Sequence, residues 1–247
     1  KRFQLQLLFA FIVLSTITIS ALLLIMLSKN SRSGKVRNIA IHHDWQYEEF
    51  VNFSDDIKVA NFGLLNYSQN VIFRHFINGD IDSHRFSFFD CRAIEPSGIH
   101  NSSLILYHLN LQAKYENLHA CFTPIDSGRP LSDAMQSPID KNYLARLRQM
   151  QKLSCLTPHY AFENHELHAN NPSLLEQFLQ QHLEESGTDI NLSTWILAHP
   201  HLHIEISDGI LLAYQPNRLL DEESIIPAIN AVSDISNSLN NADILEQ

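Results

Sequence analysis

The sequence contains few glycines and none of the common catalytic loops. Only 7 of its 247 residues are glycine, and it has no glycine-rich phosphate-binding loop, no Gly-x-Ser-x-Gly elbow and no His-Glu-x-x-His motif. These absences exclude nucleotide-loop chemistry and the hydrolase classes that use those motifs. They favour a protein that is not an enzyme.

Cysteine is also scarce. The chain has three cysteines, Cys91, Cys121 and Cys155, which lie far apart and form no Cys-x-x-Cys pair. Neither a zinc ribbon nor a thioredoxin-like site is therefore encoded, and a disulfide-stapled secreted domain would carry an even and denser set. We expect three reduced, buried thiols.

Positive charge is in deficit. The chain has 17 Lys and Arg against 27 Asp and Glu, for a formal net charge of −10. An acidic chain repels phosphate backbones, so nucleic acid is not an expected partner.

Charge is missing altogether from residues 3–27. A helix rises about 1.5 Å per residue, so about 25 residues cross a hydrocarbon core of about 30 Å with some tilt. A cleaved signal peptide fits less well, because its apolar core is only about 7–15 residues. The sequence predicts one N-terminal transmembrane helix, with residues 1–28 as a single-pass anchor in the lipid bilayer.

Small and hydroxylated side chains interrupt this apolar run. They would allow another membrane helix to approach closely, and Ser15, Thr18 and Ala21 are the predicted partner-binding residues. The alternative, a helix that faces only lipid, stays open.

Basic residues flank the predicted anchor unequally. They are Lys1 and Arg2 before it and Lys29, Arg32, Lys35 and Arg37 after it. The chain begins at Lys1 and not at a methionine, so this count of basic residues does not include any that precede Lys1. By the positive-inside rule, four against two favours the cytoplasmic side for the rest of the chain, as do the unpaired cysteines.

Beyond the anchor the patterns predict an α+β fold. Residues 29–46 are predicted to form a basic tether with a short helix over 38–45. Residues 47–240 are predicted to form a soluble domain. Predicted strands, which form an antiparallel meander, are 71–77, 84–91, 103–111 and 118–123. Predicted turns are Asn78-Gly79-Asp80 and residues 95–98.

The second half is predicted to combine helices with a hairpin. A loop over 124–138 precedes a helix over 139–152, and a further helix begins at Asn171-Pro172 and ends at Gly187. Alternation over 202–206 and 210–214 predicts a hairpin with one buried face, and Asp221 caps a final helix. The predicted class is α+β, with antiparallel meander and hairpin sheets and packed helices.

The layout resembles an uncharacterised family of bacterial single-pass membrane-anchored proteins. The similar features are a basic tether leading to Trp45-Gln46-Tyr47, a glycine at Asn78-Gly79, the pair Phe89-Asp90, and a hairpin around Asp208-Gly209. The chain departs from that group in having Cys91 where an aromatic residue is usual and in lacking most of the tether's arginines. The resemblance implies a cytoplasmic α+β domain and no catalytic residues.

One histidine run raises a metal-binding alternative. On a strand, His199, His201, His203 and Glu205 would share one face, and imidazole and carboxylate suit zinc, copper or nickel. The competing interpretation is a solvated strand face, because residues in a straight row lie about 7 Å apart and metal sites usually gather ligands from several elements.

Other acidic and histidine clusters match no metal motif. The segment with His165, His168 and Glu166 is predicted to be a polar surface segment, and His42-His43-Asp44 a polar helix face. Asp80, Asp82 and Asp90 lack the spacing of an EF-hand. We expect no cofactor.

Two functions follow. The first is a non-catalytic accessory or assembly subunit of a hetero-oligomeric membrane protein complex. The second is a membrane-tethered metal-binding protein or enzyme that uses the His199–His203 strand.

Overall fold

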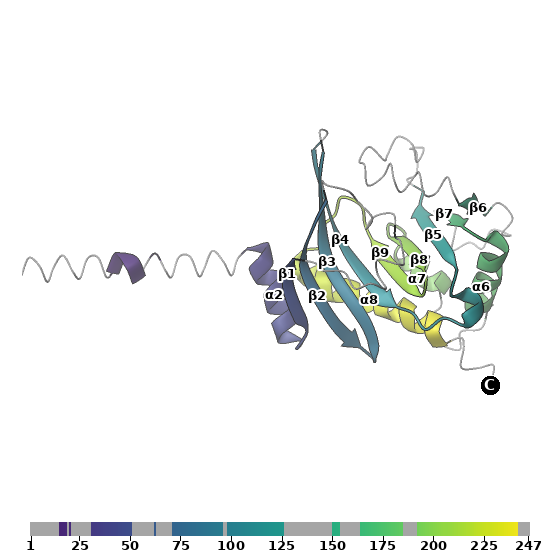
Figure 1. Cartoon of the computed structure of the whole chain (residues 1–247), viewed down its shortest axis with the longest axis horizontal. Coiled ribbons are helices and arrows are strands. Elements are labelled where there is room, and N and C mark those ends of the chain that lie inside the picture. The colour runs from purple at the N-terminus through teal and green to yellow at the C-terminus, as the bar shows by residue number, and fades with distance from the viewer. Residues whose placement is uncertain are drawn as a thin grey trace, which may run out of the picture.

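The computed structural model describes residues 15–18, 20, 31–50, 62, 71–95, 98–125, 150–153, 164–184 and 192–241. Most of the predicted anchor, including Ala21, lies outside these residues. Within them, no helix is both long enough and apolar enough to cross a membrane. Residues 15–18 are helical and are drawn apart from the main body in Figure 1.

One nine-stranded sheet organises the described residues, with the strand order β1-β2-β3-β4-β9-β8-β5-β7-β6, and every pairing is antiparallel. Its strands are β1 (Gln46–Phe50), β2 (Val71–Ile81), β3 (His84–Glu95), β4 (Gly98–His108), β5 (His119–Pro124), β6 (Gln151–Lys152), β7 (His165–Ala169), β8 (His203–Ser207) and β9 (Ile210–Tyr214). The predicted α+β class is confirmed.

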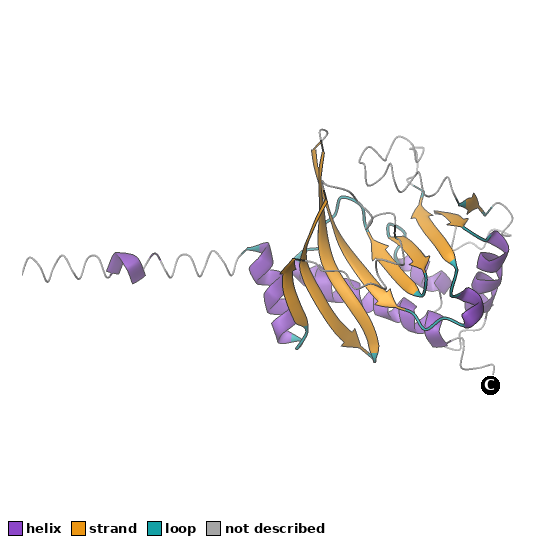
Figure 2. Cartoon of the chain, in the orientation of Figure 1, coloured by secondary structure: helices purple, strands orange, loops and turns teal. Residues whose placement is uncertain are grey.

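Five helical segments accompany the sheet in the described part of the chain: α2 (Arg32–His42), the 3-10 turn η1 (Ala113–Tyr115), α6 (Pro172–Glu184), α7 (Leu192–Ala198) and α8 (Glu222–Asn241). Figure 2 shows α8 running across the sheet and α2 beside β1. The apolar stripe of α8 packs in the main core: Ile225, Ile229, Val232, Ile235 and Leu239.

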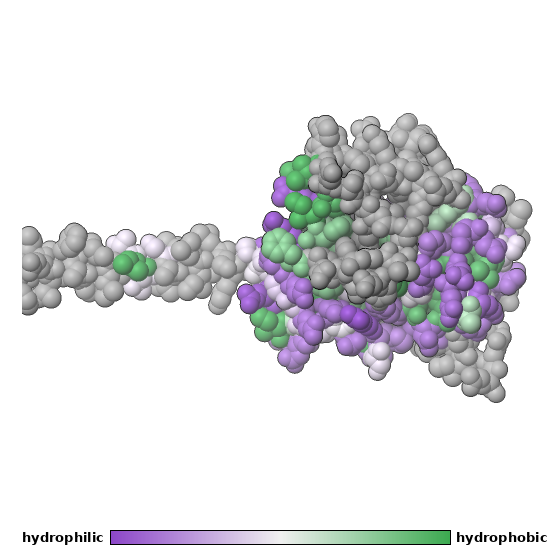
Figure 3. Space-filling view, viewed as in Figure 1, coloured by the Kyte–Doolittle hydropathy of each residue, from purple (hydrophilic) through white to green (hydrophobic). Residues whose placement is uncertain are grey.

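The sheet is covered on both faces. Side chains on one face of the sheet pack with the helices in the main core. Side chains on the other face, including Phe89, Leu104 and Leu212, form a second core with the fully buried Phe62. Apolar side chains remain exposed at Phe50 on the edge strand β1, and at Ile94 and Ile99, which pair at the hairpin end of β3 and β4. Figure 3 shows a hydrophobic patch over that end of the molecule.

The hairpin β8–β9 and the caps of two helices agree with the sequence. Asp208 and Gly209 turn the chain with positive φ values of 48° and 71°. The Asn171 side chain accepts a hydrogen bond from the Leu174 amide at 3.2 Å, and Asp221 accepts one from the Ser224 amide at 2.8 Å, so each satisfies a helix N-terminal amide. The predicted end of α6 at Gly187 lies outside the described residues.

Four predicted boundaries were wrong. The strand β2 continues through Asn78-Gly79-Asp80 to Ile81, and the chain turns at Asp82 and Ser83, both with positive φ. The helix α2 begins at Arg32, within the predicted tether. Strand β4 ends at His108 rather than at residue 111. Gln151 and Lys152 form a short strand instead of the end of a helix, and Met150 before them is not helical. Residues 139–149 of that predicted helix lie outside the described residues.

Candidate functional site

The first helix after the predicted anchor is held on the sheet by a partly buried ion pair. Arg32 Nε and Nη2 donate to the two carboxylate oxygens of Asp90 at 2.8 and 2.9 Å. Arg32 Nη1 also donates to the Leu220 carbonyl, while the Ser103 hydroxyl donates to Asp90 Oδ1 at 2.7 Å. The Arg32–Asp90 pair therefore joins α2, β3, β4 and the segment before α8.

The bidentate geometry makes this contact strong. Asp90 is 7% exposed, and two parallel charge-assisted hydrogen bonds are among the strongest polar contacts that proteins make. Removing Arg32 would leave the buried Asp90 carboxylate without compensation, at a cost below the ~3–5 kcal/mol of a fully buried pair, because the Arg32 side chain is 25% exposed. The second link between α2 and α8, Lys35 with Glu222 at 3.4 Å, is largely exposed and contributes little.

Local sequence explains why α2 forms at this place. Ser31 caps it by accepting a hydrogen bond from the Gly34 amide at 3.1 Å. Val36 and Ala40, four residues apart on one face, are fully buried. The helix is thus fastened by an apolar contact on one side and by Arg32 at its first position.

A second polar network borders the first, at the junction of α2, β1 and β2. Tyr47 Oη donates to Glu49 Oε2 at 2.7 Å, and Ser33 Oγ donates to the same oxygen. His75 Nδ1 lies 3.3 Å from Tyr47 Oη and 3.7 Å from Glu49 Oε1. His75 has φ 58° at a register shift between Arg74 and Ile77, and this bulge directs its ring to the network.

Electrostatics keep the network in one protonation state at neutral pH. Burial, together with the Glu49 carboxylate, raises the pKa of Tyr47 to about 12. Burial alone would raise the pKa of Glu49, but hydrogen bonds from Ser33 and Tyr47 lower it. Burial lowers the pKa of His75, although Asp90 and Glu49 act in the opposite direction. The phenol is neutral and Glu49 is ionised, which suits a structural junction.

Two cavities are described, and neither borders this junction network. One, of about 490 Å³, is polar and lies between the α2–β1 connection and the β2–β3 turn, next to Trp45, Asn78 and Arg85. The other, of about 320 Å³, lies between α8, the ends of β4 and β9, and the segment 198–202.

The four predicted metal ligands are dispersed. His199 follows α7, its ring 4.5 Å from Trp195, and His201 is exposed. His203 and Glu205 lie on β8 and are buried, at 6% and 1% exposure, so the expected solvated strand face was wrong. No three His, Cys, Asp or Glu side chains among the described residues are grouped so as to hold a metal ion.

Three polar side chains from segments far apart in the sequence lie side by side on adjacent strands and are buried. Cys121 on β5 lies opposite His168 on β7 and Glu205 on β8, and all three side chains are at least nine-tenths buried. The prediction of a polar surface segment at His165 and His168 was therefore wrong. Only the strand pairing brings these three together, because they are separated by 47 and 37 residues.

The reduced state of two cysteines is confirmed, since Cys91 and Cys121 are free and buried. Burial raises the pKa of the Cys91 thiol to about 12, which makes it a poor nucleophile. Cys155 lies outside the described residues.

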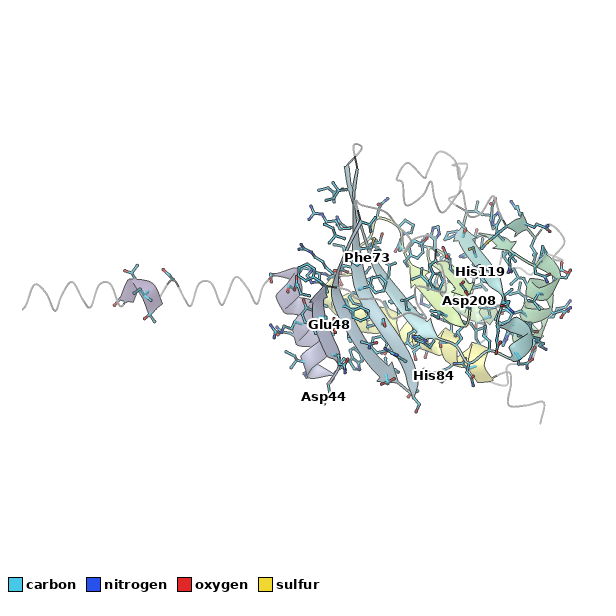
Figure 4. All side chains as sticks on the ribbon, in the orientation of Figure 1. Asp44, Glu48, Phe73, His84, His119 and Asp208 are labelled. Carbon is cyan, nitrogen blue, oxygen red and sulfur yellow. The ribbon has the colours of Figure 1, made fainter. Side chains whose placement is uncertain are left out.

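Smaller polar contacts lie at the sheet margins. His119 and Asp208 are close to each other in Figure 4, with Nε2 and Oδ2 separated by 3.6 Å. His84, at the start of β3, lies with its Nδ1 at 3.1 Å from the Asn240 amide nitrogen of α8. Both contacts join strand ends to neighbouring elements and border no described cavity.

The predicted membrane contact residues are only partly described. Ser15 is half-buried and Thr18 exposed within the helical residues 15–18, and Ala21 is not described.

Comparison with protein-family models, with curated proteins and with solved structures gave no match.

Proposed function

We propose that this chain is a membrane-anchored, non-catalytic accessory subunit of a membrane protein complex, with its folded part on the cytoplasmic side, as in the bacterial anchored proteins that its layout resembles. The observation that carries the proposal is the Arg32–Asp90 pair. Only three residues, 29–31, separate the predicted anchor from α2. A link this short keeps the folded part close to the predicted anchor.

Such a short link has a physical consequence for assembly. A flexible tether would only raise the local concentration of the domain at the membrane. A short connection into a helix that is fastened by a bidentate ion pair also limits the orientations that the domain samples. This lowers the entropy that is lost when the domain meets a partner in one geometry.

The test is co-purification of the full chain from membranes in mild detergent. Replacing Ser15, Thr18 and Ala21 together by Leu keeps the segment apolar but removes its small surface. We expect the variant to remain in the membrane fraction and to lose its stoichiometric membrane partners. The matched control replaces Thr16 and Ser20 by Leu, which removes similar polarity from another face of the helix and is expected to retain the partners.

Two results would contradict this. If the triple variant retains every partner, the helix is a passive anchor. If no membrane protein co-purifies with the unaltered chain at a fixed ratio, the accessory role itself is wrong.

A further inference from the structure

The cavity of about 320 Å³ beside α8 has the size and lining of a small-molecule site. Ligand pockets measure about 300–1,000 Å³ and are mostly apolar with a few placed polar groups. Most of its walls are apolar, formed by Ile105, Leu202, Ala213, Ala228 and Val232, with Pro227 from the second turn of α8. Small side chains along α8 leave this space open.

The polar groups that line this cavity include one fixed positive charge and no carboxylate. The lining includes Arg218, His199 and His201, and it includes no Asp or Glu. The remaining polar residues are two serines, Gln215 and Tyr214, which are neutral. A chain with a net charge of −10 thus presents here a pocket without a single carboxylate.

Arg218 retains donors for a ligand. Its Nη1 donates to the Gln215 amide oxygen at 2.8 Å. Its side chain is exposed and forms no ion pair among the described residues, although its charge acts on the Asp221 carboxyl, whose pKa is lowered chiefly by hydrogen bonds from Ser224 and to a smaller extent by Arg218. A guanidinium carries five N–H groups in a planar fork that matches a carboxylate. His199 is also oriented, because its Nδ1 lies 2.9 Å from the Trp195 carbonyl and must therefore carry the proton. In the neutral ring Nε2 is then an acceptor, so the anion-binding donors of this cavity come from Arg218.

We propose that this cavity binds a small monocarboxylate with an apolar body. The carboxylate pairs with the free side of the Arg218 guanidinium, and the apolar body lies against α8 and β9. The cavity adjoins the Arg32–Asp90 junction through Ser103 and Leu220, but ligand binding there does not depend on the accessory role proposed above. It differs from the predicted metal site, because His199 and His201 act here as neighbours of an anion.

The experiment is isothermal titration of octanoate and of palmitate into the full chain in lipid nanodiscs, with empty nanodiscs as the reference. We expect saturable binding at one site per chain. Tighter binding of palmitate would identify a fatty acid from the bilayer as the source, and tighter binding of octanoate a soluble acid. We expect 1-octanol and octylamine, which share the tail of octanoate, to bind at least tenfold more weakly because they lack the carboxylate.

Variants separate the head group from the body of the ligand. Arg218→Gln should weaken binding at least tenfold, since charge-assisted hydrogen bonds are lost. Ala198→Phe, at an exposed position on the rim, should abolish binding by filling the cavity. The control Arg92→Gln removes an exposed arginine from β3 and should change nothing.

Three results would overturn the proposal: no saturation with either acid, equal affinity for 1-octanol, or unchanged binding by both Arg218→Gln and Ala198→Phe in variants whose melting temperatures match the unaltered chain.

Discussion

Several histidines of this chain are held neutral by the packing around them. His182 on α6 is 2% exposed, and its ring lies 4.4 Å from that of Phe178. Burial, with a smaller effect of the Lys114 charge, lowers the pKa of His182 to about 4. Burial lowers the pKa of His203 to about 3. An unfolded chain instead protonates its histidines near pH 6.5.

His182 therefore makes the stability depend on pH on the acid side. Its folded-state pKa is depressed, so its contribution is intact above pH 6.5 and is lost as the pH falls toward about 4. We expect His182→Leu to reduce the acid-side slope of the unfolding free energy by up to about 1.4 kcal/mol per pH unit in that window. Urea unfolding at several pH values measures this slope.

The exposed His42 supplies the control for this measurement. His42→Leu removes a histidine from the surface of α2 and should leave the slope unchanged. An acid-side slope that is the same in His182→Leu as in the unaltered chain would show that His182 does not carry this effect.

At the scale of the elements, Trp45 fastens the α2–β1 connection to the sheet. Its ring meets Phe86 edge-on at 4.8 Å, and the His43 ring stacks on it at 4.6 Å. The space for the indole is provided by Gly79, where an added Cβ would lie 2.8 Å from Trp45 Cγ and 2.9 Å from Phe86 Cε1. Gly79 is therefore present for close packing within β2 and not for a turn.

Gly79→Ala should destabilise the fold by about 1–3 kcal/mol, the usual cost of overpacking a filled core. A double-mutant cycle with Trp45→Ala tests the cause, because without the indole the same substitution should cost less than about 1 kcal/mol. Chemical denaturation of the four proteins provides the coupling free energy. Equal costs in both backgrounds would mean that Trp45 is not the obstacle.

At the scale of the whole molecule, the positions of the basic residues after the predicted anchor bear on the orientation of the chain at the membrane. Two of the basic residues after the predicted anchor form ion pairs with the folded part: Arg32 with Asp90 in a partly buried contact, and Lys35 with Glu222 at the surface. Arg32 and Lys35, which follow the predicted anchor closely in the chain, are therefore held by the folded part. The cytoplasmic orientation nevertheless rests on the positive-inside rule and stays a prediction.

Cysteine labelling on intact cells tests this orientation. Asn241→Cys, at the end of α8, should not react with a membrane-impermeant thiol reagent until the cells are permeabilised. Arg2→Cys, on the other side of the predicted anchor, should react in intact cells and serves as the control. The opposite pattern of labelling would place the folded part outside the cytoplasm.

Local signals in the sequence predicted much of the fold. The strand at Val71, the hairpin at Asp208-Gly209 and the caps at Asn171 and Asp221 depend on residues a few positions apart, and each lies where the pattern indicated. The prediction of a turn at Gly79 was wrong because the role of this glycine depends on a residue far away in the chain. A glycine beside Asn and Asp has the composition of a turn, whereas its environment is set by Trp45, which lies 34 positions earlier in the chain.

The sequence by itself therefore determined the α+β class, the helix caps, the apolar stripe of α8 and the scarcity of catalytic motifs. Only the tertiary structure decided which polar residues are buried and which meet. The alternation around Ile204 is typical of a strand with one wet face, yet this sheet is covered on both faces, so His203 and Glu205 are buried. The Arg32–Asp90 pair and the cavity beside Arg218 likewise bring together residues that lie far apart in the chain. Long-range contacts of this kind leave no periodic signal in the sequence, so only the tertiary structure reveals them.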